Sequence, residues 1–231
     1  MTKNDYLQQY KILHTENNYY GASSLRYLDY VCMIIDYLKP KVVLDFGCGK
    51  AALIKELTQR YPTIEFYGYD PAIPGRNILP IEKADLVVNT DVLEHIPEDA
   101  LPEVIAKIAS ISDNAFFVLH HALARQILPN GQNAHCTVKP PQWYYELFSK
   151  YFKNPYPLPS KDLLRSAVIT FTPSVDFLNT YSSITRLSPI VVMQENRKII
   201  PYRLGKLISY FIPKKKNRKH FREKYVQTKK G

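Results

Sequence analysis

The sequence predicts an α/β protein with a doubly wound, mostly parallel sheet. Short β-branched runs such as KVVLDF lack polar alternation, which is typical of parallel strands buried on both faces. These runs alternate with amphipathic helical segments, and Gly or Pro residues separate the two. A chain of 231 residues, 45% apolar and 23% charged, is long enough to bury a full core without disulfide bonds. We therefore expect one domain with appendages.

The expected elements follow from these patterns in chain order. Residues 24–38 place apolar side chains three and four positions apart, which predicts a helix that ends before Pro40. The remaining expected elements are strands at 41–46, 64–69, 84–90 and 114–121, helices at 53–61, 97–110 and 142–152, and two later β-rich segments, 166–172 and 188–194, that complete the sheet.

The positive charge of the chain is concentrated at one end. The net charge is +10, yet residues 197–231 contain 13 Lys and Arg and one acid, which leaves 18 bases against 20 acids in residues 1–196. The body is therefore close to neutral. We expect a domain over 1–196, with an N-terminal helical extension over 1–39, followed by a basic tail over 197–231.

The tail combines this charge with an apolar stripe. Apolar residues recur from Leu204 to Ile212 at helical spacing, and the basic run KKKNRKHFREKY follows Pro213. This pattern favours peripheral binding to an anionic membrane surface. A helix packed on the domain's own core and an RNA-binding arm are the alternatives, and RNA ranks last because the body carries no excess positive charge.

Cysteine usage and hydropathy indicate a cytoplasmic protein. Three cysteines, odd in number and widely spaced, form neither a disulfide framework nor a zinc quartet. The first eighteen residues are polar, unlike a signal peptide. No run approaches the ~18 apolar residues of a membrane-spanning helix. We expect a cytoplasmic location, with peripheral association at the inner face of the membrane through the tail.

A Gly-rich turn between the first predicted strand and its helix indicates a ligand site, because glycine lets a ligand approach the backbone. Asp45 precedes Gly47 and Gly49 in this turn. A carboxylate here would repel a pyrophosphate but suits a ligand that carries an ammonium and a sulfonium group. Asp70, at the end of the next strand, is placed to accept hydrogen bonds from ribose hydroxyls.

These residues resemble the class I S-adenosylmethionine-dependent methyltransferases. Leu44–Gly49 is similar to their first motif, Asp70 to their ribose-binding acid, and Thr90–Pro97 to the segment after their fourth strand. The resemblance implies a Rossmann-like methyltransferase fold and S-adenosylmethionine as cofactor. It departs from the family at Ala51, which replaces a third Gly and is expected to be entering the helix. The implied cofactor contacts are Asp45, Phe46, Gly47, Cys48, Gly49, Asp70, Pro71 and Asp91.

The second departure from the pattern of these methyltransferases concerns the adenine pocket. Only 14 residues separate Asp70 from Asp85, too few for the usual helix and strand. The acid that commonly meets the adenine therefore has no clear counterpart here, since Glu82 is a poor candidate.

Histidines near the carboxyl ends of the predicted strands are candidates for the base that removes a proton from the methyl acceptor. His95 or His135 would be this base, and Glu94 would orient it. For His95, packing at the start of its helix is an equal alternative.

The same residues could instead hold a metal ion. Asp91, Glu94, His95 and His135 together supply two carboxylates and two imidazoles, a set suited to Mg²⁺ or Mn²⁺. This set is similar to the ligands of small-RNA 3′-terminal 2′-O-methyltransferases. A metal-dependent RNA 2′-O-methyltransferase is therefore an alternative function.

A weaker resemblance points to the acceptor. The segments 128–135 and 139–143 resemble methyltransferases encoded among bacterial surface-polysaccharide enzymes. The resemblance implies O-methylation of a sugar or glycan precursor, which could be lipid-linked. Aromatic side chains at 143–145 would stack on a sugar ring, and amides at 130, 132 and 133 would bind its hydroxyls. The third hypothesis is a non-catalytic, cofactor-binding partner protein.

Overall fold

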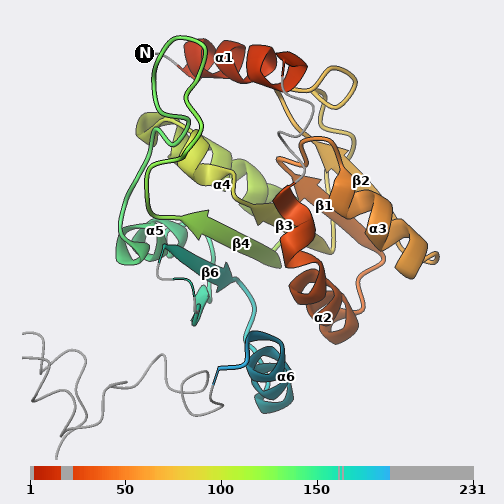
Figure 1. Ribbon diagram of the computed structural model, residues 1–231. Helices are drawn as coiled ribbons and strands as arrows, with labels where there is room; N and C mark the ends of the chain where they lie inside the picture. Colours follow the sequence, from red (N-terminus) through yellow and green to blue (C-terminus); the bar gives the residue numbers. More distant parts are fainter. Residues whose placement is uncertain (1–2, 17–22, 161, 163, 188–231) are drawn as a thin grey trace, which may run out of the picture. The chain divides into compact units, whose positions relative to one another are not determined.

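The structure, a computed structural model, describes residues 3–16, 23–160, 162 and 164–187 (Figure 1). The chain divides into two compact units, 1–173 and 174–231. In the second unit the structure describes one helix, α6 (Val175–Thr185). The expected strand at 188–194 and the tail at 197–231 lie outside the described residues. Within the described ranges, no helix has the length and apolar character needed to cross a membrane.

The first unit is built on a sheet whose strand order is β2-β1-β3-β4-β6-β5. The first four strands in this order are parallel, and β6 and β5 add to them in antiparallel fashion. The predicted α/β class with a mostly parallel sheet is thus confirmed. The strands are β1 (Val42–Phe46), β2 (Glu65–Tyr69), β3 (Leu86–Thr90), β4 (Ala115–His120), β5 (Tyr156–Leu158) and β6 (Arg165–Ile169).

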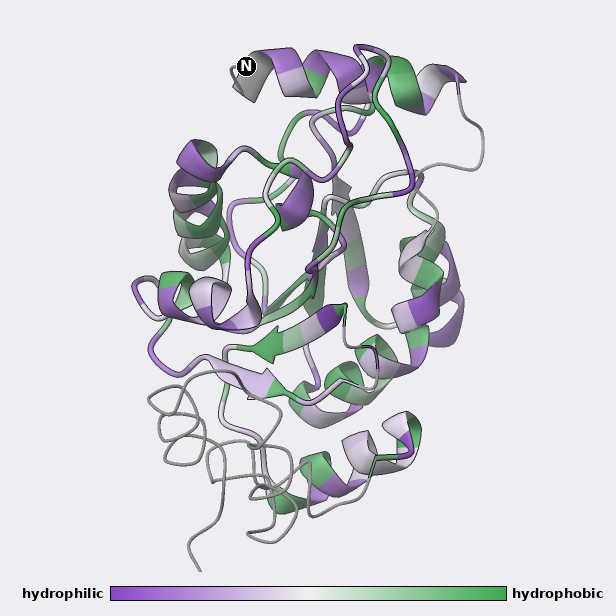
Figure 2. Ribbon diagram, turned by 60° about the vertical axis from the view of Figure 1, so that its left-hand side comes forward, coloured by the Kyte–Doolittle hydropathy of each residue, from purple (hydrophilic) through white to green (hydrophobic). Residues whose placement is uncertain are grey.

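Helices cover both faces of the sheet, as expected for a doubly wound fold (Figure 1). The pair α2 and α3 lies on one face and the pair α4 and α5 on the other. Each of these helices contains buried apolar residues, and Figure 2 shows green, apolar stretches along them. The helix expected at 24–38 begins as a 3-10 turn, η1 (Ser23–Tyr27), before α2. The helices of this unit are α1 (Lys3–Glu16), α2 (Leu28–Leu38), α3 (Ala52–Arg60), α4 (Leu101–Ile111) and α5 (Pro141–Phe148).

The connection between β2 and β3 is short. Residues 71–85 contain neither a helix nor a strand. The absence of a helix and a strand here agrees with the short spacing between Asp70 and Asp85. Because no further strand follows β2 in this connection, β2 is an edge strand of the sheet.

The parallel strands end at one edge of the sheet, and that edge carries the polar residues singled out from the sequence. In the register of the sheet, Asp45 on β1 pairs with Gly68 on β2 and with Val88 on β3. Strands β1, β3 and β4 are almost fully buried, so the backbone that follows each of them starts from a well-packed position. Helix α1 lies across the same edge (Figure 1) and forms a small apolar cluster with the loops there.

Candidate active site

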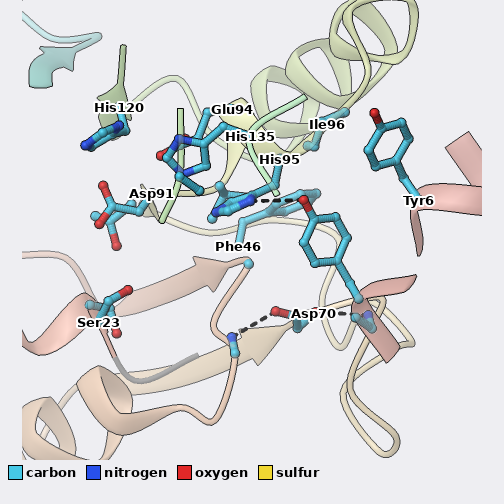
Figure 3. A pocket seen from close by; sticks show the side chains of 18 of the residues that line it. Tyr6, Ser23, Phe46, Asp70, Asp91, Glu94, His95, Ile96, His120 and His135 are labelled. Atoms are coloured by element: carbon cyan, nitrogen blue, oxygen red, sulfur yellow. Dashed lines mark hydrogen bonds between the residues drawn. The ribbon is translucent and has the colours of Figure 1, made fainter. Parts of the chain in front are cut away.

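A cavity of about 800 Å³ lies at this edge of the sheet. Its wall is formed by residues that follow β1, β2, β3 and β4, by η1, by the start of β6 and by one side of α1. Asp70 lies on one side, Glu94, His95 and His135 lie on the other, and Phe46 lies between them beside His95 (Figure 3). The cavity thus joins the predicted cofactor motifs to the predicted base candidates.

The Gly-rich turn is held by the neighbouring strand. The backbone N–H groups of Gly47 and Cys48 donate to the Tyr69 carbonyl at 2.7 and 3.1 Å. Gly47 has a φ of +91°, and a Cβ at this position would lie 2.4 Å from a methyl group of Val92. Only glycine therefore fits this position, and the turn presents its backbone to the cavity.

Asp70 braces the same turn. One carboxylate oxygen accepts from the Gly49 N–H and the other from the Ala72 N–H, both at 2.9 Å (Figure 3). The side chain lines the cavity although it is largely buried. Each carboxylate oxygen can accept more than one hydrogen bond, so both can still bind hydroxyl groups of a ligand.

Asp45 occupies a different position from the one its sequence context suggests. It is 3% exposed and is not among the described residues that line the cavity. One carboxylate oxygen is buried without a hydrogen-bond partner in the described part of the chain. Burial, with a further contribution from the Asp70 charge, raises the pKa of Asp45 to about 7 against the opposing influence of Arg76. Asp45 therefore lies beneath the turn rather than in the cavity wall.

Asp91 lies in the cavity wall but is already bound by protein groups. The Tyr27 hydroxyl donates to its two carboxylate oxygens, at 2.8 and 2.9 Å. The Arg165 Nε lies 3.7 Å from one of these oxygens. The backbone of Asp91 is left-handed, with φ of +53°, which turns the chain away from the end of β3. Burial and the Asp91 charge raise the pKa of Tyr27 well above its usual value, so its hydroxyl keeps its proton.

His95 and His135 lie side by side, with ring centroids 4.8 Å apart. The Nδ1 of His95 lies 3.0 Å from the Ala134 carbonyl, and that of His135 lies 2.5 Å from the Ala122 carbonyl. Burial lowers the pKa of His95 to about 3 and also lowers the pKa of His135, so both rings are neutral at pH 7.

Glu94 is fully buried beside these imidazoles and lines the cavity (Figure 3). Neither carboxylate oxygen has a side-chain hydrogen-bond partner among the described residues, so no hydrogen bond from Glu94 orients either ring there, and only the backbone N–H groups of Glu94 and His120 oppose the rise of its pKa. Burial and the Asp91 charge raise the pKa of Glu94 well above its usual value. One ligand atom from each of Glu94, His95 and His135 lies within 4.8 Å of the others. Asp91 does not belong to this group, which differs from the four-residue metal set expected from sequence.

Tyr10 and Arg165 enter the cavity from elements that the sequence did not point to, whereas His120 was expected at this edge from its place at the end of a strand. Tyr10 on α1 shares a hydrogen bond with His95 Nδ1 at 3.1 Å and also donates to the Ala134 carbonyl. The His120 ring lies beside that of His135 at a tilted angle, with ring centroids 4.8 Å apart. Arg165 reaches the cavity because β6 is antiparallel and begins at the edge where β4 ends, so that it pairs with His120. The signal that could have found Tyr10 is the apolar face of a helix over 3–16, on which Tyr10 and Leu13 lie three residues apart.

The expectation of a sugar-binding wall from residues 143–145 and from the amides at 130, 132 and 133 is wrong for this cavity, since none of them lines it. Tyr144 is fully buried and donates to the Thr137 carbonyl at 2.9 Å. Residues 143–145 do not line the cavity. The Asn133 amide instead binds the backbone of Ala124, at 2.9 and 2.8 Å, and so shapes the loop that leads to His135. The α5 aromatic residues pack on the sheet because that face of the helix is apolar.

The fold and the cavity define an α/β protein with a ligand site at the carboxyl edge of its sheet. The chain belongs to the methyltransferase domain family, whose model matches residues 24–163. The predicted resemblance to methyltransferases is thereby confirmed at the level of the family. The comparison with curated proteins gives no significant match.

Three solved structures are similar to parts of this chain. An O-methyltransferase family protein from Burkholderia thailandensis matches with a TM-score of 0.50 and 14% identity over 65% of this chain and 56% of its own. Human N-acetylserotonin methyltransferase, in complex with S-adenosylmethionine, matches with a TM-score of 0.48 and 16% identity over 75% of this chain and 57% of its own. The small RNA methyltransferase HEN1 matches with a TM-score of 0.49 and 16% identity over 65% of this chain and 25% of its own. The chain thus spans little more than half of the first two proteins.

Proposed function

We propose that this chain binds S-adenosylmethionine and transfers the methyl group to a hydroxyl oxygen of a sugar in a bacterial surface-polysaccharide precursor. The observation that carries the proposal is a single cavity with the Gly47–Gly49 turn and Asp70 on one side and neutral imidazoles on the other. Membership of the methyltransferase domain family supports the cofactor and the reaction class.

The cofactor side of the cavity fits a nucleoside with an exposed ribose. The side chain of Asp70 accepts ribose hydroxyls with the lone pairs that the two backbone N–H groups leave open. The turn at Gly47 has no Cβ, so the backbone there can approach the ligand closely. Phe46 and Pro71 contribute apolar wall on this side.

The reacting side offers His135 as the base. Its Nδ1–H donates to the Ala122 carbonyl, which leaves Nε2 as the acceptor. S-adenosylmethionine supplies an electrophilic methyl group when bound. His135 Nε2 takes the hydroxyl proton as the acceptor oxygen bonds to the methyl carbon and the carbon–sulfur bond breaks. His95 is the poorer base, because a pKa of about 3 lies far below the working pH.

The sugar acceptor is supported by the resemblance of segments 128–135 and 139–143 to polysaccharide-associated methyltransferases and by the composition of the cavity. Tyr6, Tyr10 and Tyr69 line the cavity with aromatic rings and hydroxyl groups, which suit the apolar faces and polar edges of a sugar.

Binding is tested by calorimetric titration with S-adenosylmethionine and with NAD, repeated with Asp70→Asn. We expect micromolar binding of the first ligand alone, weakened at least tenfold in the variant. Transfer is then tested with radiolabelled cofactor and three acceptors: nucleotide sugars, lipid-linked saccharides and single-stranded RNA with a free 3′ end. Labelled saccharide supports the proposal. Labelled RNA would replace the sugar with the alternative acceptor, and binding without transfer to any of the three would favour a non-catalytic partner.

A further inference from the structure

We infer that Glu94, His95 and His135 form a binding site for one divalent transition-metal ion in the wall of the cavity. The site consists of two imidazoles and one carboxylate whose ligand atoms lie within 4.8 Å of one another. Ligand atoms bound to a common ion at about 2.1 Å lie roughly 3 Å apart, so small side-chain rotations would close the set.

The hydrogen bonds of the two histidines prepare them for this role. Each ring uses Nδ1 on a backbone carbonyl, Ala134 for His95 and Ala122 for His135. A donated Nδ1–H places the lone pair on Nε2, which is the atom that then binds a metal. Histidines that bind metals commonly donate their other N–H to a carbonyl in this way.

Glu94 supplies the independent observation. It is 0% exposed, it lines the cavity, and no side chain in the described part of the chain donates a hydrogen bond to its carboxylate, although the backbone N–H groups of Glu94 and His120 partly oppose the rise of its pKa. A buried carboxyl without a side-chain partner costs free energy of folding unless a cation or a further hydrogen-bond donor meets it. A metal ion between Glu94 and the two imidazoles would supply that partner.

The donor set determines the kind of ion. Mg²⁺ prefers oxygen ligands in an octahedral arrangement, whereas a set of two imidazoles and one carboxylate suits first-row transition-metal ions such as Fe²⁺ or Zn²⁺, with Mn²⁺ the weakest-binding member of that series. A site with two carboxylates would have admitted Mg²⁺ more readily. The two oxygens of Asp91 are instead held by Tyr27, with Arg165 beside them, so Asp91 stays outside the set.

The site has a consequence for the acceptor. Three protein ligands leave coordination positions open, and an ion with open positions can bind the oxygen of a hydroxyl group. The acceptor class that fits is therefore a molecule with a free hydroxyl, or with two adjacent hydroxyls, as in a sugar. This last step rests on the proposed function, with one change. When His135 Nε2 binds the ion it cannot act as the base, and polarisation of the hydroxyl by the ion would replace the proton abstraction assigned to His135. The metal site itself does not rest on the proposed function.

The test uses the full chain, stripped with a chelator, and measures binding of Mn²⁺ by the loss of the free-ion electron paramagnetic resonance signal. We expect one Mn²⁺ per chain, at least tenfold weaker binding of Mg²⁺ in competition, and at least tenfold weaker Mn²⁺ binding in Glu94→Gln and in His135→Ala. His121→Ala is the matched control, because both ring nitrogens of His121 are bound to Lys139 and Ser166 within the protein. Its Mn²⁺ affinity stays at the wild-type value.

Three outcomes would overturn the inference: no Mn²⁺ binding at millimolar concentration, unchanged affinity in Glu94→Gln, or Mg²⁺ binding as tight as Mn²⁺. Loss of Mn²⁺ binding in Asp91→Asn would overturn the three-residue set in favour of the four-residue one. Circular dichroism and calorimetric titration with S-adenosylhomocysteine show that each variant remains folded. If the wild-type chain does not bind S-adenosylhomocysteine, that result would count against the proposed function but not against the metal site.

Discussion

Gly47 shows at the scale of one residue how the cofactor side of the cavity depends on the absence of a side chain. Its φ of +91° and the 2.4 Å approach of an added Cβ to Val92 are two separate penalties. Gly47→Ala should destabilise the protein by about 3 kcal/mol, since overpacking and backbone strain add. We expect cofactor binding to weaken at least tenfold. Urea denaturation and calorimetric titration measure the two effects.

Gly131→Ala separates strain from contact. Gly131 has φ of +84°, but an added Cβ meets nothing within 4 Å. This variant should lose about 1 kcal/mol, from backbone strain alone, and bind cofactor normally. Equal losses of stability and of binding in the two variants would show that the contact with Val92 is unimportant.

The raised pKa of buried Asp45 predicts that the stability of the fold depends on pH. Its pKa is raised to about 7 in the folded chain by burial and the Asp70 charge, with Arg76 opposing, so the folded state holds a proton that the unfolded state has lost. The free energy of unfolding therefore falls as pH rises from about 4 to 7, by at most about 1.4 kcal/mol per pH unit from this group. Asp45→Asn cannot ionise, so its stability relative to wild type should increase over that range.

The measurement is urea denaturation of both proteins at several pH values between 4 and 8. Asp113→Asn, which alters an exposed carboxyl, serves as the control and should run parallel to wild type. A parallel curve for Asp45→Asn would mean that Asp45 is ionised in the folded protein throughout this range.

The predictability of single residues depends on whether their role follows from local sequence. The Gly47 turn and the position of Asp70 could be predicted, because the turn directly follows a recognisable strand and Asp70 ends the next strand along the chain. Ala51 could not be described correctly, since it has φ of +58° before α3 rather than entering the helix. Arg165 was missed because its position depends on the direction of β6, which hydrophobic periodicity does not reveal.

At the scale of elements, α1 is held over the cavity by a small apolar cluster rather than by the main core. Leu13 and Tyr10 are 5% and 8% exposed and pack with Ala72, Leu128 and Ala134. Tyr10 also bonds to His95, so the position of α1 is linked to the reacting side.

Leu13→Ala should release α1 while the sheet stays folded. The lost burial and the resulting cavity cost about 2 kcal/mol, which is large for a small cluster. We expect faster amide hydrogen exchange in residues 5–16 with little change in the parallel strands. Lys11→Ala, on the exposed side of the same helix, is the control. Unchanged exchange in Leu13→Ala would show that the cluster does not hold α1.

Elements with strong apolar runs were predicted from sequence, whereas β5 was not. The parallel strands have no polar alternation because both of their faces are covered, and this is visible in the sequence. By contrast, β5 has three residues and includes Pro157, which is tolerated because β5 is an edge strand. The start of the 24–38 segment is a 3-10 turn that ends at Tyr27, whose hydroxyl donates to Asp91, a contact between distant residues that periodicity does not reveal.

At the scale of the whole molecule, the charge distribution separates a nearly neutral body from a basic tail. Residues 197–231 carry 13 bases and one acid of the total of 31 bases and 21 acids. We propose that this tail binds an anionic membrane surface, because it also carries an apolar stripe from Leu204 to Ile212. A lipid-linked acceptor would then be concentrated near the cavity.

Deletion of 197–231 should abolish binding to vesicles that contain phosphatidylglycerol and leave cofactor affinity unchanged. Each base contributes on the order of 1 kcal/mol near an anionic surface, so the loss should be nearly complete. Vesicle sedimentation and calorimetric titration measure the two properties. Full-length chain with Lys214, Lys215 and Lys216 changed to Gln tests the charge alone and should bind the vesicles at least tenfold more weakly. Neutral phosphatidylcholine vesicles should bind neither protein, and added salt should weaken binding of the wild type. Undiminished vesicle binding by the shortened chain would place the membrane contact on the body and contradict the proposal.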